Sequence, residues 1–349
     1  MIWIGVDAHK RIHQAVAIDD RGITGERRIA NAPAAWAQLL GWAQQWPERI
    51  WAVEGAWYLG RGLAQYLAGQ GERVHEVSGR ITARRRGGMI RRGKSDRLDA
   101  HAVAVVLRED AARLPRVLAE DDESAAVQLW SRTQAELTKD MTRLVNRLHD
   151  LLLLCDPEYQ PKLPALTSKA GIAALRTYVA PGTGALARER ELVIRRTAEQ
   201  LALLDGQDRE LRKKLERASR GTFRALRQIE GVGALISCGL IAEVGRPRPG
   251  FGEAQLAALA GVSPLEASSA GATRHRLNRG GNRRLNMFFH QIVLTQARIY
   301  PPAQAYLARR RAEGRTDREA RRALKRLIVR RVFHALSSCF DRSVERVAA

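Results

Sequence analysis

Three features are scarce or missing in this chain: cysteine, acidic charge and long apolar runs. The three cysteines, Cys155, Cys238 and Cys339, are odd in number and far apart, which favours reduced thiols over disulfides or a zinc knuckle. The eight histidines show no paired metal spacing. The leucine run at 151–154 is far shorter than the ~18 apolar residues that a membrane span requires. A disulfide scaffold, a zinc site and a membrane partner are therefore not expected.

The shortage of acid leaves the chain strongly positive. Lysine and arginine total 59 against 37 aspartates and glutamates, which gives a formal net charge of +22 at pH 7. Such an excess favours a polyanionic partner, because each phosphate that a basic side chain neutralises releases a counterion. We therefore expect nucleic acid as the partner. The first ten residues, MIWIGVDAHK, lack the basic and apolar segments of a secretory signal, so a cytoplasmic location is expected.

The first hundred residues predict a mixed α/β sheet. With 349 residues, 45% of them hydrophobic, the chain is long enough for two or three domains with ordinary cores. Three apolar runs in a meander, followed by helical and apolar segments in alternation, indicate such a sheet. The expected strands are 2–7, 13–20, 27–30, 50–54 and 73–77, and the expected helices are 34–46, 58–68 and 95–107.

The middle of the chain, residues 119–220, changes to helix-forming residues. One stripe of apolar residues repeats at alternating steps of four and three, which is typical of a coiled coil, and a second stripe keeps the same register. A proline-rich link separates them, so we expect an antiparallel helical arm. Such a stripe more often forms ordinary bundle core than an oligomer interface. The stripes are Leu137, Met141, Leu144, Leu148 and Leu151, then Ile194, Leu201, Leu204, Leu211 and Leu215, with Asp208 as a polar break.

The last third contains a glycine turn and an arginine-rich helical stretch. Gly231 and Gly233 lie between two apolar helical segments and resemble a helix-hairpin-helix turn, whose free N–H groups can bind a phosphate. A plain tight turn between helices is the alternative. Residues 309–331 predict a helix, and its expected buried side is made of Ala323, Leu324, Leu327 and Ile328.

Two glycine-containing segments concentrate arginine and predict phosphate binding. The first spans residues 80–94, and the second spans 263–286 and leads into a helix from about residue 283. Basic side chains hold a nucleic acid by its phosphates, whereas a solvated basic run is the alternative for the first segment. The expected contacts are Arg84, Arg85, Arg86, Arg91, Arg92 and Lys94 in the first segment, and Arg274, Arg276, Arg279, Arg283 and Arg284 in the second.

Four carboxylates in the N-terminal third predict a divalent metal site. Asp7 and Glu54 each follow an apolar strand, at the end where ligands gather in open α/β sheets. Asp96 and Asp99 are three residues apart at the start of a helix that Ser95 caps, so they share a face near its positive end. Carboxylate oxygens are the ligands that Mg²⁺ and Mn²⁺ prefer, and two such ions can stabilise the attacking and leaving oxygens of phosphoryl transfer.

The neighbours of these acids receive no role. His9 and Lys10 follow Asp7 closely and His101 lies near Asp99, but a lone histidine is more often structural. Each acid by itself also suits a turn cap, an ion pair or a helix N-terminus. It is the four together that favour the metal site.

The acidic motifs resemble those of a known family. GVDAHK with Asp7, AVEGAW with Glu54 and KSDRLDAHAVA with Asp96 and Asp99 are similar, in order and spacing, to the DEDD motif of the insertion-sequence one-ten family of transposases. The later segments IEGVG, AALAGVSPLEASSAG and RHRLNRGGNRRLN are similar to that family's second conserved domain. The resemblance thus covers nearly the whole chain, and it implies that the four acids bind metal.

The resemblance also implies an architecture of three domains. A RuvC/RNase H-like DEDD domain is expected at 1–118, and a helical coiled-coil arm at 119–220. A mostly helical C-terminal transposase domain that carries a catalytic serine is expected at 221–349.

The family's catalytic serine corresponds to Ser269 in this chain. In the family it stands in a Ser-Gly pair five residues after a proline, and counting from Pro264 gives Ser269. Ala270 stands where glycine is expected, so Ser268 remains a rival. By residue type alone, such a serine pair is typical of a plain turn. His275 is the one conventional base nearby, so we expect metal and carboxylates to activate the serine across a subunit interface.

The function implied is that of a DNA transposase that cuts and rejoins strands. The resemblance implies Mg²⁺ or Mn²⁺ as cofactor, donor and target DNA as substrates, and a structured bridge RNA that pairs with both. A homo-oligomer, either a dimer or a tetramer, is expected because recombination handles two duplexes. Within the bacterial cytoplasm, association with the nucleoid is expected. The alternatives are a RuvC-like nuclease or resolvase that uses water and a non-catalytic nucleic-acid scaffold. Cleavage by a Ser269→Ala variant and metal-dependent cutting would discriminate them.

Overall fold

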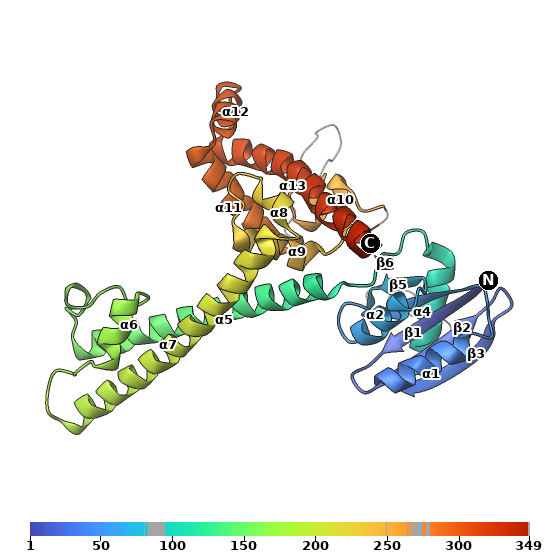
Figure 1. Cartoon of the computed structure of the whole chain (residues 1–349), viewed down its shortest axis with the longest axis horizontal. Helices are drawn as coiled ribbons and strands as arrows, with labels where there is room; N and C mark the ends of the chain where they lie inside the picture. Colours follow the sequence, from blue (N-terminus) through green and yellow to red (C-terminus); the bar gives the residue numbers. More distant parts are fainter. Residues whose placement is uncertain are drawn as a thin grey trace. The chain divides into compact units, whose positions relative to one another are not determined.

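The chain forms two compact units in the computed structural model (Figure 1). The first unit comprises Met1–Asp121 with Arg248–Gly250, and the second comprises Asp122–Pro247 and Phe251–Ala349. The predicted division into three domains stays a prediction. The structure describes residues 1–79, 81–82, 95–248, 250–263, 265–266, 275–276 and 280–347.

A six-stranded mixed sheet forms the centre of the first unit. Its strand order is β3-β2-β1-β4-β5-β6, with antiparallel pairing from β1 to β3, parallel pairing from β1 through β4 to β5, and an antiparallel β6 at the edge. This order confirms the predicted mixed α/β fold of RuvC/RNase H-like type. The strands are β1 (Ile2–Ala8), β2 (Ile12–Ile18), β3 (Ile23–Ala30), β4 (Arg49–Glu54), β5 (Val74–Val77) and β6 (Arg116–Val117).

Helices cover both faces of this sheet. On one face, α1 (Pro33–Ala43) and α2 (Arg61–Gly69) contribute to a core with Val6 and Val53 of the strands. On the other face, α4 (Asp96–Asp110) packs over alternate residues of the same strands. Because successive strand residues point to opposite faces, β1 and β4 bury both faces and are apolar almost throughout.

Two long helices of the second unit pack side by side. They are α5 (Asp122–Cys155) and α7 (Ala185–Arg220), with η1 (Gln160–Lys162) and α6 (Lys169–Arg176) between them in the chain. They run antiparallel: Gln134 in the first half of α5 donates to Asp208 Oδ1 in the second half of α7 at 2.8 Å, whereas Leu148, further along α5, packs with Ile194 in the first half of α7. The predicted polar break at Asp208 is thus a buried residue that has a partner. The helical arm is present, and its coiled-coil character stays a prediction.

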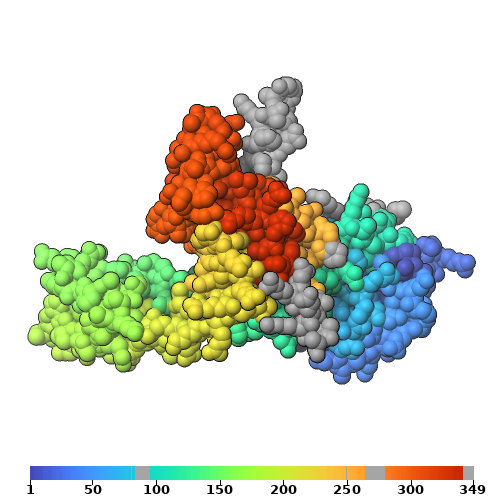
Figure 2. All heavy atoms as spheres, turned by 45° about the horizontal axis from the view of Figure 1, so that its top comes forward, coloured from blue at the N-terminus to red at the C-terminus, as the bar shows by residue number. Residues whose placement is uncertain are grey.

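The far end of this helix pair has its own core. Leu148 of α5 packs there with Ile194 and Leu201 of α7, together with residues of α6. Figure 2 shows α6 and the segments beside it, coloured green, covering this end of the pair. Several members of both predicted apolar stripes therefore lie in a helix–helix core.

Short helices complete the second unit around a second core that contains Phe223 and Phe289. They are α8 (Arg224–Arg227), α9 (Ala234–Val244), α10 (Glu253–Leu259), α11 (Arg283–Ile299), α12 (Pro301–Ala312) and the longer α13 (Asp317–Val347), and a small sheet pairs β7 (Leu265–Glu266) with β8 (His275–Arg276). Within the described part of the chain, none of the helices combines the length and the apolar character that a membrane crossing requires.

The predicted helical stretch over residues 309–331 is helical, but a turn interrupts it between α12 and α13. α12 ends at Ala312, and Gly314 then adopts a φ of +78°, a conformation that favours glycine and ends the helix. Thr316 restarts it, because its N–H donates to Glu319 Oε2 at 2.9 Å while its hydroxyl accepts from the Glu319 N–H. Leu327, predicted to be buried, is 47% exposed, because the helix turns its neighbour Ile328 into the core.

Candidate active site

Two of the four predicted acids lie at the ends of adjacent parallel strands. Val6 of β1 pairs with Val53 of β4, and the next residues along the two strands are Asp7 and Glu54. Paired residues of parallel strands share a face of the sheet. Both carboxylates therefore leave the same edge on the same face, which is the face that α4 covers.

Gly5 brings the helix that carries the other two acids onto β1. It lies two residues before Asp7, hence on the same face. A Cβ on Gly5 would lie 2.2 Å from the backbone nitrogen of Ala104 and 2.3 Å from the carbonyl oxygen of Ala100. The backbone of α4 therefore rests directly on the strand. Asp99, next to Ala100 in the chain, is only 7% exposed at this contact.

The first turn of α4 supplies Asp96 and Asp99. The Ser95 hydroxyl accepts a hydrogen bond from the Leu98 N–H at 3.3 Å, which confirms the predicted cap. Both aspartates lie in this first turn, where the helix dipole favours negative charge. Asp96 is about half exposed, whereas Asp99 is buried.

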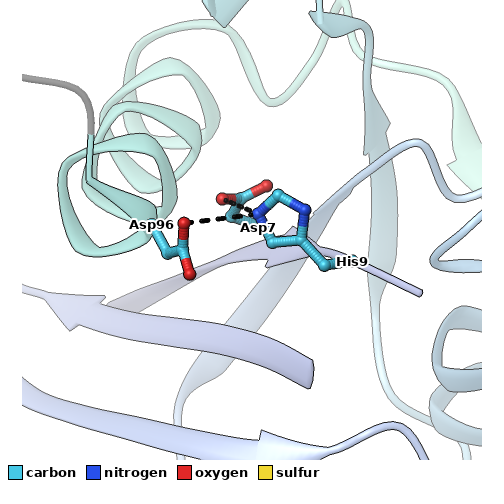
Figure 3. A group of neighbouring side chains, drawn as sticks. All are labelled: Asp7, His9 and Asp96. Atoms are coloured by element: carbon cyan, nitrogen blue, oxygen red, sulfur yellow. Dashed lines mark hydrogen bonds and ion pairs between the residues drawn. The ribbon is translucent and has the colours of Figure 1, made fainter. Parts of the chain in front are cut away.

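His9 connects the strand acid to the helix acid (Figure 3). Its Nε2 lies 3.0 Å from Asp7 Oδ2 and 3.5 Å from Asp96 Oδ1. These three residues offer ligand atoms that all lie within 4.8 Å of one another, which suits a metal ion. No role was predicted for His9 from the sequence. The one sequence feature that could have indicated a role is its position two residues after an aspartate at the end of a strand.

Glu54 is held by a buried threonine that sequence reasoning missed. The Thr82 hydroxyl donates to Glu54 Oε2 at 3.1 Å, and Thr82 is fully buried. Gly79 leaves room for the other oxygen, because a Cβ there would lie 2.7 Å from Glu54 Oε1. Neither residue belongs to a sequence pattern that indicates this contact.

The acids are close enough to change the protonation of Asp7. The pKa of Asp7 is raised to about 6, mainly by burial and also by the negative charges of Glu54 and Asp99, while His9 opposes the shift. At neutral pH several carboxylates therefore lie close together in one partly desolvated site. Hard oxygen ligands with surplus negative charge fit a divalent cation such as Mg²⁺ or Mn²⁺.

The raised pKa of Asp7 predicts that the metal-free protein loses folding stability as the pH rises. A carboxylate whose pKa is raised on folding contributes stability below its unfolded pKa near 3.8, and this contribution is lost as pH rises through about 6. Asp7→Asn is therefore expected to raise the free energy of unfolding at pH 7.5 by roughly 1–3 kcal/mol, with little gain at pH 4. Urea unfolding of both proteins with a chelator, across this pH range, measures it. An unchanged difference between the two proteins at all pH values would contradict the prediction.

The two glycines of the predicted hairpin turn have different roles. Gly231 has a φ of +86°, and a Cβ there would lie 3.2 Å from the Ile292 carbonyl oxygen, so both its conformation and its packing on α11 favour glycine. Gly233 is the N-cap of α9 in extended conformation, with open space where a Cβ would lie. Their contact with nucleic acid stays a prediction.

Arg284 is engaged inside the protein. Its guanidinium donates to Glu243 Oε1 at 2.8 Å and to the Ser131 carbonyl and hydroxyl at 2.7 and 2.9 Å. These contacts tie α11 to α9 and α5. Its predicted contact with phosphate stays a prediction, and so does that of Arg283, whose side chain is exposed.

The base of the serine-bearing segment is tightly closed. A Cβ on Gly281 would lie 2.4 Å from the Gly261 nitrogen, and the Asn282 N–H donates to the Leu259 carbonyl at 2.6 Å. Arg276 is described only as backbone of β8. The other predicted residues of both basic segments lie outside the described residues, namely Ser268, Ser269, Arg274, Arg279, Arg84, Arg85, Arg86, Arg91, Arg92 and Lys94.

Comparison with known proteins bears directly on these acids. A transposase family model for DEDD enzymes of IS110 elements matches residues 4–157, which include all four of them. The model of the transposase IS116/IS110/IS902 family matches residues 223–308. Both halves of the chain thus match transposases.

Similar proteins come from insertion elements. The 44.8 kDa protein of insertion element IS116 from Streptomyces clavuligerus is 29% identical and covers 93% of this chain and 92% of its own length. The 42 kDa protein of insertion element IS900 from Mycobacterium paratuberculosis is 24% identical, with 93% of each chain covered. Among solved structures, RuvC of Thermus thermophilus in complex with a Holliday junction substrate has a TM-score of 0.28 and 14% identity over 34% of this chain and 99% of RuvC. From the two family models and these relatives, the chain belongs to the IS116/IS110/IS902 family of DNA transposases.

Proposed function

We propose that this transposase cuts and rejoins DNA by holding Mg²⁺ or Mn²⁺ on Asp7, Glu54, Asp96 and Asp99 and attacking with a serine. The observation that supports the proposal is that Asp7 and Asp96 both lie beside His9, while Glu54 and Asp99 are near enough to raise the pKa of Asp7. A bound divalent cation would neutralise charge on the attacking and leaving oxygens. The hardness and the surplus charge of the carboxylates favour such an ion.

The protein's own residues position the ligands. Ser95 and Gly5 fix the helix end that carries two of the acids. Thr82 fixes the Glu54 carboxylate, and His9 holds Asp7 near Asp96. Ligands held in place by such contacts lose less freedom when a cation and a phosphate bind. The site is therefore largely organised in the metal-free protein.

The nucleophile that we propose is Ser269. Its hydroxyl oxygen would attack the scissile phosphorus, and the deoxyribose oxygen of the broken bond would leave and take up a proton. The resulting phosphoserine keeps the energy of the bond, so a hydroxyl of a second strand can displace the serine and join to the phosphate. Arg274, Arg276 and Arg279 would neutralise the phosphate during both steps.

We further propose that a structured bridge RNA chooses the sequences that are joined. Base pairing would then read donor and target DNA, while the protein holds the backbones through charge. The net charge of +22 supports this division. A dimer or tetramer is proposed because two duplexes must be handled together.

Serine substitution tests the chemistry. Ser269→Ala is expected to abolish strand cleavage and the covalent protein–DNA adduct, whereas Ser268→Ala retains both, because only one hydroxyl forms the phosphoserine. The assay uses the complex purified from cells on paired DNA substrates, with adducts resolved on denaturing gels and ribonuclease treatment expected to abolish strand exchange. If Ser269→Ala and Ser268→Ala both cleave like the unaltered protein while the acids remain essential, water is the nucleophile and the enzyme is a hydrolytic nuclease. Strand exchange that survives ribonuclease would contradict RNA guidance.

A further inference from the structure

A basic groove lies in the second unit between the C-terminal part of α7, the start of α9 and α11. It has a volume of about 870 Å³. The segment of α7 that forms its wall is yellow in Figures 1 and 2, and Figure 2 shows exposed surface over this segment. Among the described residues that line the groove, four are basic and one, Glu216, is acidic; the basic ones are Arg212, Lys213, Arg217 and Arg220.

Helical periodicity places these basic residues together. Lys213, Arg217 and Arg220 follow one another at steps of four and three, so they share one face of α7. The opposite face carries Leu215, which is buried in the core of the unit. The Cys238 thiol of α9 donates to the Leu215 carbonyl at 3.3 Å, so the helix that forms the floor is packed against the one that forms the wall.

Two of the four charges have no acidic partner among the residues that the structure describes. Arg212 pairs with Asp208 at 2.5 Å, and Arg220 pairs with Glu216 at 2.6 Å. Lys213 and Arg217 are exposed and form no ion pair with any acid in the described ranges of the chain. Within the described part of the chain, the groove therefore presents positive charge that no ion pair compensates.

The floor of the groove adds backbone donors to these charges. Ala234, Leu235 and Ile236 line it and form the first turn of α9. Their N–H groups have no partner within the helix, and the N-cap, Gly233, has no side chain that could accept from them. The positive end of the helix dipole thus adds to the charge of the wall.

We propose that this groove binds the phosphodiester backbone of a nucleic-acid strand. From Lys213 to Arg220 the wall extends roughly 10 Å at ~1.5 Å per residue, a length that corresponds to about three phosphates of one strand at ~3.4 Å of axis each. The described residues that line the groove include none of the four acids. The proposal rests on the proposed function in one respect, the choice of a nucleic acid over another polyanion. Such a site holds a strand in place and reads no sequence.

A charge-matched pair of double variants tests the groove. Lys213→Gln with Arg217→Gln removes the two unpaired charges, and Arg196→Gln with Arg209→Gln removes two charges from the same helix outside the groove lining. Binding of the full chain to a labelled duplex DNA, single-stranded DNA and RNA of equal length is measured by fluorescence anisotropy at several salt concentrations. The groove variant is expected to bind roughly tenfold more weakly and to lose about 2 from the slope of log K against log salt, with the control variant close to the unaltered protein. The nucleic acid that shows the largest loss identifies the strand that the groove holds.

Three outcomes would overturn the proposal. The first is an unchanged salt slope in the groove variant, and the second is an equal loss of nucleic-acid binding in the control variant. The third is loss of binding to a polyglutamate peptide while nucleic-acid binding stays intact, which would show that the groove binds an acidic protein. Calorimetric titration of Mn²⁺ and thermal unfolding of the same variants verify that the acids and the fold are intact. Since an acid variant should lose metal binding and keep the salt slope, failure of the groove proposal and failure of the proposed function are distinguishable.

Discussion

Asp7→Asn is expected to reduce metal-dependent strand cleavage by at least about a thousandfold. Asp7 is the acid whose pKa responds to the others, because both Glu54 and Asp99 raise its pKa, and His9 contacts it. An amide keeps the shape of the side chain and removes the negative charge, so the proposed cation would lose a carboxylate ligand. Cleavage rates at saturating Mg²⁺ and Mn²⁺ affinity by calorimetry measure the two effects.

Asp20→Asn is the matched control for this variant. Asp20 lies in the turn after β2 and is exposed, and the same chemical change there is expected to leave cleavage unaltered. The expected gain in stability of the metal-free Asp7→Asn protein separates loss of activity from unfolding. If the Asp7→Asn variant cleaves at more than a tenth of the normal rate, Asp7 is not a metal ligand and the proposed chemistry is wrong.

Gly5→Ala is expected to separate the two halves of the acid set. The added Cβ would meet backbone atoms of Ala100 and Ala104 at 2.3 and 2.2 Å, and backbone cannot rotate away as a side chain can. Either α4 moves off the strand or the sheet deforms, at a cost of about 3 kcal/mol or more. Because Asp96 and Asp99 move with α4, Mn²⁺ affinity is expected to fall even at temperatures where the variant is folded.

Gly41→Ala is the control for that substitution. Gly41 lies in α1 with open space around the position of a Cβ, so alanine there is expected to be neutral or stabilising by up to about 1 kcal/mol. Thermal unfolding and Mn²⁺ titration of both variants give the comparison. Normal metal affinity in folded Gly5→Ala protein would show that the approach of α4 to β1 does not assemble the site.

Local patterns were sufficient to predict where each acid lies in its own element. Asp7 and Glu54 follow short apolar runs that indicate buried strands, and Ser95 marks the start of the helix that carries Asp96 and Asp99. These signals extend over a few residues, which is the range over which sequence determines backbone conformation. The strand order and the face that each acid takes then follow from pairing and from the alternation of side chains.

The contacts that organise the site had no such signal. A glycine in a strand has several possible reasons, and only the position of α4 shows which one applies to Gly5. Thr82 reaches Glu54 across 28 positions of the chain. Arg284 was predicted to contact phosphate from its place in a basic segment, yet its partners Glu243 and Ser131 lie on two other helices. Composition cannot distinguish an arginine that is paired inside the protein from one that faces a ligand.

The sequence by itself determined the classes of structure and chemistry. These are a mixed sheet followed by long helices, four acids at the ends of elements, and a net positive charge that favours binding to nucleic acid. Tertiary structure alone decided which groups touch. Helical and strand periodicity repeat every few residues and specify a face, but the neighbour on that face comes from a distant segment, and the distance between them depends on packing. The closeness of α4 to Gly5, the bridging position of His9 and the exposed charges of Lys213 and Arg217 in one groove are therefore properties of the folded chain.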